Sequence, residues 1–344
     1  MKKRIAVIVS CLAVIGMLLL GMFTYYQNHV AKITGTDTDL KEYSRHYLFI
    51  SSDQSQMWQD IYEAASKAAD ARGVYLEWCG RETGSGYSDA DCIDIGIASD
   101  VDGIILYPHG DEDLTEAVAG AQENGIPVVT LVRDIPNSGR ISYVGVSNYQ
   151  RGVLYGNEIA KLLHEGENQV CLLTDAGDSE VELNLLYAQM TQSVKDMADE
   201  GKSMSLTARR VDSATDFDAE EIIRNLFVES DAPDIVICET PVQTDCAIQT
   251  LIDYNKVGTI QVIGFYTTQM TMSALRRELI PAAMTLDTAA LGADGVQALD
   301  EYLDSGHVSD YYNISLQCLR SEDVYRYTAS QHMAAEQAEE GGTS

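Results

Sequence analysis

The chain has 344 residues, which is enough for two ordinary domains, and 45% of them are hydrophobic, which is enough to build real cores. Its 53 acidic residues outnumber its 23 basic residues and give a formal net charge of −30. Such a chain repels phosphate backbones, which argues against nucleic acid as a partner.

The N-terminus has the pattern of a membrane anchor. Lys2, Lys3 and Arg4 precede a run over residues 5–23 that contains no charged residue. At about 1.5 Å of rise per residue, a helix of this length nearly spans a bilayer core of about 30 Å. The basic start should stay inside the cell, so the rest of the chain is expected outside the cytoplasmic membrane, held by a single span.

Two alternatives to a retained anchor stay open. A cleaved signal peptide usually has a shorter apolar run and a small-residue cleavage site, and no convincing Ala-x-Ala site precedes Lys32. A lipoprotein would be cleaved before Cys11, but the apolar run continues well past that residue. We therefore predict a cytoplasmic start and transmembrane anchor over residues 1–27 and a polar linker over residues 28–45.

Alternating strand and helix patterns fill most of the remaining chain. In the first half we predict strands at 47–51, 74–78, 103–106, 128–131 and 142–146, with helices between them. In the second half we predict strands at 169–174, 205–211, 234–238 and 261–265, and helices at 148–164, 180–199, 219–229 and 244–254. The tail over residues 328–344 is short of apolar side chains and is expected to be disordered.

Residues 101–148 carry the clearest of these units. Two short apolar runs flank an amphipathic helix that Gly125 ends, which is the pattern of a parallel βαβ unit. Ligands of parallel sheets bind beyond the carboxyl ends of the strands, and a guanidinium beside a carboxylate suits a polyhydroxylated molecule. The residues at these two strand ends are Tyr107, His109, Arg133 and Asp134.

Three segments of the first half carry a family resemblance: DGIIL-x-P, NGIPVVTLVRD and ISYVGVSN. They resemble the ribose-binding type of sugar-binding proteins, the type I periplasmic binding proteins, over roughly residues 47–324. The resemblance implies an α/β fold of two Rossmann-like lobes with parallel sheets, joined by a hinge that the chain crosses three times, near 147, 287 and 305–310. It places 46–147 plus 287–306 in lobe 1, and 148–286 plus 310–326 in lobe 2.

The resemblance also implies where a ligand would bind. In such proteins aromatic side chains after the first strand stack on the sugar ring, and Trp58 falls on one of these positions, although it could instead pack between the lobes. Ser52 and Asp53 on the same loop can bond hydroxyls or cap the next helix. The family has Asp-Arg after its fourth strand, where this chain has Val132-Arg133. Arg133 is expected to contact the ligand or to pair with a neighbouring carboxylate.

The second lobe departs from the sugar-binding pattern at several positions. Glu239 replaces an asparagine, Tyr266 replaces a carboxylate and Leu286 replaces a glutamine. We therefore expect a pocket that is more apolar and more aromatic than a pentose site. The candidate contacts from this side of the site are Asp175, Glu239, Tyr266 and Asp287.

The cysteines and histidines predict no metal site. The seven cysteines fit no zinc-binding spacing and the six histidines are scattered, so neither a metal nor a cofactor is expected. Cys79 and Cys92 flank a glycine-rich loop and can pair outside the cell. Cys171, Cys238 and Cys318 lie in strand-like runs and are expected to be buried small hydrophobes.

The sequence thus predicts a membrane-tethered, extracytoplasmic binding protein. No Gly-x-Ser-x-Gly motif or activated nucleophile supports an enzyme. The expected function is capture of a small carbohydrate-like solute between two lobes that close about a hinge, for import through an ABC-type permease. The alternative is a ligand-sensing subunit that signals to a membrane histidine kinase, as some membrane-anchored relatives of the resembled family do.

Overall fold

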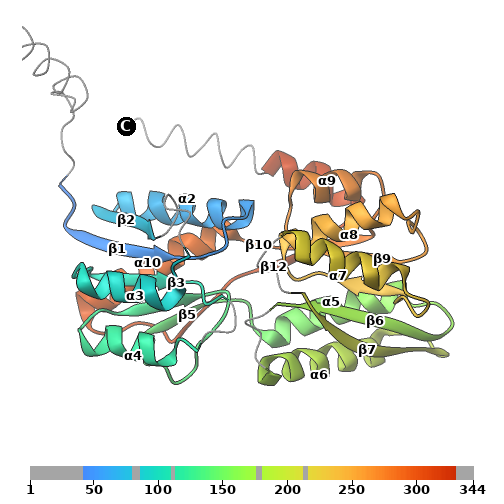
Figure 1. Cartoon of the computed structure of the whole chain (residues 1–344), viewed down its shortest axis with the longest axis horizontal. Helices are drawn as coiled ribbons and strands as arrows, with labels where there is room; N and C mark the ends of the chain where they lie inside the picture. Colours follow the sequence, from blue (N-terminus) through green and yellow to red (C-terminus); the bar gives the residue numbers. More distant parts are fainter. Residues whose placement is uncertain (1–41, 80–85, 110–112, 176–179, 212–215, 331–344) are drawn as a thin grey trace, which may run out of the picture. The chain divides into compact units, whose positions relative to one another are not determined.

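The computed structural model describes residues 42–79, 86–109, 113–175, 180–211 and 216–330 (Figure 1). Within these ranges no helix combines the length and the apolar character that a membrane span needs. The predicted anchor at residues 5–23, most of the linker and the end of the tail lie outside the described residues.

Lobe 1 is built on a six-stranded sheet in which every neighbouring pair is parallel. Its strand order is β11-β5-β4-β3-β1-β2. Its strands are β1 (Arg45–Ile50), β2 (Val74–Cys79), β3 (Gly103–Leu106), β4 (Val128–Leu131), β5 (Ser142–Gly145) and β11 (Tyr311–Asn313). Its helices are α2 (Gln56–Asp70), α3 (Asp89–Ala98), α4 (Thr115–Glu123) and α10 (Thr288–Ser305). Strands β3 and β4 are buried along their whole length, because helices cover both faces of a parallel sheet.

Lobe 2 repeats this plan with the strand order β12-β10-β9-β8-β6-β7. Its strands are β6 (Gly166–Thr174), β7 (Lys202–Arg210), β8 (Ile235–Ile237), β9 (Gln261–Phe265), β10 (Ala282–Leu286) and β12 (Leu316–Leu319). Its helices are α5 (Asn148–Leu162), α6 (Glu180–Met197), α7 (Asp216–Val228), α8 (Pro241–Asp253) and α9 (Gln269–Arg276), and a 3₁₀ turn, η1 (Ser321–Asp323), follows β12. The sequence had predicted a parallel sheet. Strand β12 instead runs antiparallel to β10, so this sheet is parallel except at that edge.

The chain passes between the two sheets three times. The first two passages occur at Ser147 and Asp287, whose side chains cap α5 and α10. The third was predicted near residues 305–310, but β11 still pairs with β5 of lobe 1. The chain therefore changes sheets only between Asn313 and Leu316, and residues 311–313 lie in the first sheet rather than in lobe 2.

Helix α10 returns to the first sheet after the strands of lobe 2, and Figure 1 shows it beside α2. A glycine permits this close approach: a Cβ atom on Gly292 would lie 2.4 Å from the carbonyl oxygen of Ile61 and 2.7 Å from the nitrogen of Ala65. These are backbone atoms of α2, which cannot rotate away. The spacing of the two helices therefore depends on the absence of a side chain at residue 292.

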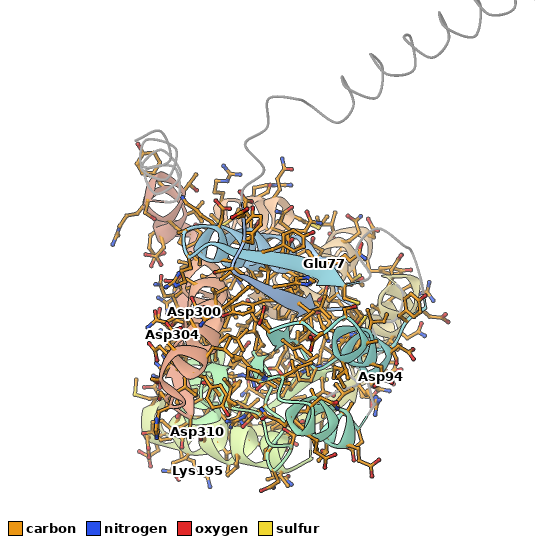
Figure 2. The ribbon with its side chains drawn as sticks, turned by 90° about the vertical axis from the view of Figure 1, so that its left-hand side faces the viewer. Glu77, Asp94, Lys195, Asp300, Asp304 and Asp310 are labelled. Carbon is orange, nitrogen blue, oxygen red and sulfur yellow. The ribbon has the colours of Figure 1, made fainter. Side chains whose placement is uncertain are left out.

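Figure 2 labels five acidic residues of lobe 1: Glu77, Asp94, Asp300, Asp304 and Asp310. Two of them hold α10 to the first strand: Asp300 and Asp304 accept hydrogen bonds from Arg45 at 3.1 and 2.6 Å. Tyr47 donates a further bond to Asp300 at 2.5 Å. The excess of negative charge thus includes residues with a structural role.

Two strand ends hold a conformation that L-residues rarely adopt. Val132 and Tyr266 directly follow β4 and β9, which occupy the same place in the two strand orders, and their φ angles are 64° and 67°. Each N–H donates to the neighbouring strand, that of Val132 to Val144 at 2.9 Å and that of Tyr266 to Met284 at 2.7 Å. A β-branched or bulky residue in this region carries strain of about 1–3 kcal/mol, so the surrounding bonds must impose it.

The predicted cysteine pair lies together. The Sγ atoms of Cys79, at the end of β2, and Cys92, on α3, are 2.6 Å apart, and both residues are free thiols in this structure. Cys171 and Cys238 are buried as predicted, whereas Cys318 on the edge strand β12 is only half-buried.

Candidate ligand-binding site

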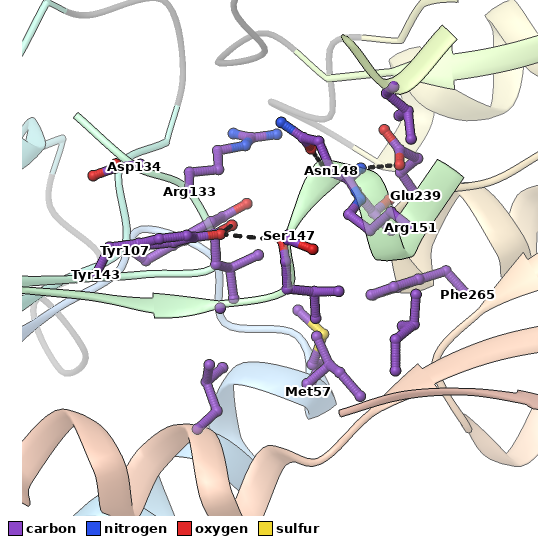
Figure 3. A pocket seen from close by; sticks show the side chains of 18 of the residues that line it. Met57, Tyr107, Arg133, Asp134, Tyr143, Ser147, Asn148, Arg151, Glu239 and Phe265 are labelled. Carbon is purple, nitrogen blue, oxygen red and sulfur yellow. Dashed lines mark hydrogen bonds and ion pairs between the residues drawn. The ribbon is translucent and has the colours of Figure 1, made fainter. Parts of the chain in front are cut away.

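A cavity of about 250 Å³ lies at the carboxyl ends of the strands and is lined by residues of both lobes (Figure 3). Small-molecule sites usually measure about 300–1,000 Å³, so this volume suits a small ligand. Lobe 1 contributes the loops after β1, β3 and β4, and lobe 2 contributes α5, α6 and the loop after β8. This is the place that parallel sheets of this kind offer to ligands.

Five of the ten predicted contacts line the cavity: Asp53, Tyr107, Arg133, Asp134 and Glu239. The other five do not: Ser52, Trp58, Asp175, Tyr266 and Asp287. Strand-end position was therefore a useful guide, but local structure decided which side chains reach the cavity.

The structure does not place Trp58 in the lining of the cavity, where the predicted stacking on the ligand would require it. Helix α2 begins at Gln56, so Trp58 belongs to its first turn and shares the buried face of Ile61 and Ala65. The indole is fully buried and stacks on Tyr107, with ring centroids 4.0 Å apart. Tyr107 lines the cavity, so Trp58 supports a lining residue from behind.

Arg133 pairs with a neighbouring carboxylate, which is one of the two roles that the sequence left open, and its contact with a ligand stays a prediction. It lines the cavity, and its Nη2 atom lies 3.2 Å from the carboxylate of Asp175, which follows β6 in lobe 2. Asp175 is buried and also lies 3.7 Å from His109. Asp175, which was predicted to contact the ligand, therefore forms an ion pair with Arg133 that joins the two lobes. The guanidinium lies 5.5 Å from the ring centroid of Tyr107, which fixes it over an aromatic face.

Tyr266 also joins the lobes, although it was predicted to contact the ligand. Its hydroxyl donates a hydrogen bond to Asp60 on α2, and the residue is buried away from the cavity. Burial, followed by the bond to Asp60, raises the pKa of Tyr266 well above its usual value. The tyrosine therefore remains a neutral donor at physiological pH.

Ser52 and Asp287 are exposed residues with no place in the lining. The carboxylate of Asp287 accepts the backbone N–H of Ala290 at 2.9 Å, because the residue caps α10. Asp287 lies just before a helix, in the N-cap position, so its carboxylate binds a backbone N–H of that helix rather than a group in the cavity.

Sequence reasoning missed a polar group contributed by α5. Arg151 forms an ion pair with Glu239 and donates to Asn148 at 3.1 Å, and all three line the cavity. Glu239 was predicted as an acceptor for the ligand, but here it accepts from Arg151. The signal was present in the sequence, because Asn148 and Arg151 are three residues apart at the start of a predicted helix and therefore share one face.

An apolar wall faces these polar groups. Figure 3 shows Met57 and Phe265 on the side of the cavity opposite Arg133, Asn148 and Arg151. Other lining residues of this type are Leu183, Leu186, Leu286, Leu291 and Leu316. The expectation of a more apolar pocket is consistent with this lining, and of these residues the sequence analysis had identified Leu286.

Comparisons with known proteins agree with this architecture. A family model described as a periplasmic binding protein domain matches residues 47–307. The ribose import binding protein RbsB of Salmonella typhimurium (strain LT2) is 22% identical over 276 residues, which cover 78% of this chain and 88% of that protein.

Solved structures share the fold at low sequence identity. GanP, a glucose-galactose binding protein from Geobacillus stearothermophilus, matches with a TM-score of 0.70 and 21% identity over 81% of this chain and 98% of its own. A chain of the XylFII-LytSN complex matches with a TM-score of 0.68 and 23% identity over 81% of this chain and 98% of its own.

Proposed function

Because the chain belongs to the periplasmic binding protein family, we propose that it captures a small carbohydrate-like solute in the cavity between its lobes, for delivery to an ABC-type permease. The observation that carries the proposal is the cavity itself, which two similar lobes build at the carboxyl ends of their strands. The similarity to a ribose import binding protein and to a glucose-galactose binding protein supports a sugar-like ligand.

A thermal-shift screen of monosaccharides and related neutral metabolites tests this function. The compact unit that begins at Ser44 is suitable material. A cognate solute at about 100 times its dissociation constant should stabilise the fold by about 2.7 kcal/mol and raise the melting temperature by about 5 °C. The variant Arg133→Ala should lose the shift. A screen in which no solute raises the melting temperature would contradict the proposal.

We also propose that residues 5–23 remain as a single membrane span and hold the binding domain outside the cytoplasmic membrane. Fractionation of expressing cells should leave full-length protein in the membrane, because a helix over the uncharged run nearly spans the apolar core of the bilayer. Replacing Leu18 and Leu19 by arginine should reduce membrane retention, since each charge disfavours insertion by roughly 2.5–3.5 kcal/mol. Recovery of a soluble protein that begins between Thr24 and Lys32 would instead demonstrate cleavage.

A sensing subunit is the second candidate function. The similar XylFII-LytSN structure is a complex, so a protein of this fold can bind a second protein. In that case the tethered domain would report ligand occupancy to a membrane histidine kinase. Neighbouring genes distinguish the two functions: a permease and an ATPase favour transport, whereas a kinase and a response regulator favour sensing.

A further inference from the structure

Apart from Asp53, whose carboxylate accepts the backbone N–H of Ser55 at 2.7 Å, the charged groups that line the cavity are paired with a group of opposite charge within the protein. Arg133 lies 3.2 Å from Asp175, Arg151 pairs with Glu239, and Asp134 accepts from Arg140 at 2.8 Å. A charged ligand would have to compete with one of these partners in a partly buried site, and this competition disfavours its binding. The arrangement therefore suits a neutral ligand.

The apolar wall is continuous across neighbouring strands. Phe265 ends β9 and Leu286 ends the adjacent strand β10, and Leu286 is the register partner of Leu316 on β12. All three residues line the cavity. A ligand that fills the cavity therefore presents one of its sides to hydrocarbon.

The polar side of the cavity carries groups that can form hydrogen bonds with the hydroxyl groups of a ligand. Arg133, Asn148 and Arg151 lie together on the opposite side in Figure 3, and Asp53 adds a carboxylate to the lining. Hydroxyls of a ligand can accept from the guanidinium groups and donate to the carboxylate. The cavity is thus amphipathic.

We propose that the ligand is a neutral molecule with a hydroxylated side and an apolar side, of the class of deoxysugars and short alkyl glycosides. This inference rests on the proposed function and narrows it. In the resembled sugar-binding pattern a carboxylate and an amide stand where this chain has Val132 and Leu286. A hydroxyl buried against these side chains loses water and gains no partner, whereas a methyl group fits, which favours the deoxy compound by about 10- to 100-fold.

Calorimetry with matched sugar pairs tests the inference. The full chain is purified in a detergent without a sugar headgroup, because alkyl glycoside detergents would compete for the cavity. The pairs are D-galactose with D-fucose, L-mannose with L-rhamnose, and D-ribose with 5-deoxy-D-ribose, and methyl and butyl glycosides extend the series. In at least one pair the deoxy member should bind about tenfold or more tightly than its hydroxylated partner.

The possible results separate this inference from the proposed function. Equal or tighter binding of the hydroxylated member in every pair that binds would overturn the inference and leave a conventional sugar-binding protein. Absence of binding by any member of the series at millimolar concentration would overturn the proposed function as well.

A single substitution should reduce the preference for the deoxy sugar over its hydroxylated partner. Val132→Asp places an acceptor in the lining, so the ratio of deoxy to hydroxylated affinity should fall by about tenfold. Val257→Asp is the matched control, because Val257 is exposed and lies outside the lining, and it should leave the ratio unchanged. An unchanged ratio in a folded Val132→Asp protein would remove Val132 from the specificity determinants.

Discussion

Replacing Gly292 by alanine should lower the free energy of unfolding by about 2–3 kcal/mol, although alanine usually stabilises a helix relative to glycine by about 1 kcal/mol. The added methyl carbon would lie 2.4 Å from the carbonyl oxygen of Ile61 and 2.7 Å from the nitrogen of Ala65. Since both atoms belong to the backbone of α2, the two helices must separate. That movement would also disturb Met57 on α2 and Leu291 on α10, which line the cavity.

Urea denaturation of the unit that begins at Ser44 measures this effect. Gly120→Ala is the control, because Gly120 lies within α4 and an added methyl group there meets no atom within 4 Å. The control should be neutral or more stable by up to about 1 kcal/mol. Equal stabilities of the two variants would show that α10 and α2 can separate without a large loss of packing.

Replacing Arg151 by methionine should lower the free energy of unfolding by about 2–3 kcal/mol and weaken the binding of the cognate solute. The substitution removes the cation that pairs with Glu239, whose side chain is only 9% exposed. Breaking a fully buried pair costs about 3–5 kcal/mol, and the expected value is smaller because Arg151 is 27% exposed. The double variant Arg151→Met/Glu239→Gln should regain stability, because a neutral glutamine then replaces the carboxylate that has lost this cation.

The comparison pair at the surface is Lys202 with Asp199, where the lysine side chain is 19% exposed but the carboxylate that its removal would leave is 80% exposed. Lys202→Met should cost no more than about 1 kcal/mol, as is usual for exposed pairs. Denaturation of the single and double variants gives the coupling energy at each pair. A coupling between Arg151 and Glu239 no larger than that of the surface pair would contradict a buried, structurally important interaction.

The parts of the fold that were predictable are those with strong local signals. The strands at 103–106 and 128–131 have the bounds that the sequence predicted, because a short apolar run between turn residues has few other structures available. Strand β11 gave no such signal, since its three residues, Tyr-Tyr-Asn, are polar or amphipathic and only half-buried or exposed. The third passage between the sheets was consequently placed too early.

The candidate site shows the same limit. Arg133 and Asp134 were found because they lie within three residues of the end of a predicted strand, and Asp53 follows the first predicted strand at a similar distance. Trp58 was assigned to the loop after the first strand, although it lies in the first turn of α2. Arg151 was missed because it lies on a helix rather than at a strand end. Which carboxylate pairs with which guanidinium depends on tertiary structure, and no local pattern carries it.

The strained residues at the ends of β4 and β9 have an evolutionary consequence. Val132 and Tyr266 hold φ angles of 64° and 67°, which aspartate tolerates better than valine or tyrosine. At residue 266 this advantage of aspartate would be offset by the loss of the hydrogen bond from Tyr266 to Asp60, whereas aspartate at residue 132 would relieve backbone strain and also add a ligand acceptor. Most mutations that create a function lower stability, yet here Val132→Asp would favour a more hydroxylated ligand and at the same time relieve backbone strain. Variants of this chain are therefore able to acquire a preference for a more hydroxylated ligand through a step that selection for folding alone would tolerate.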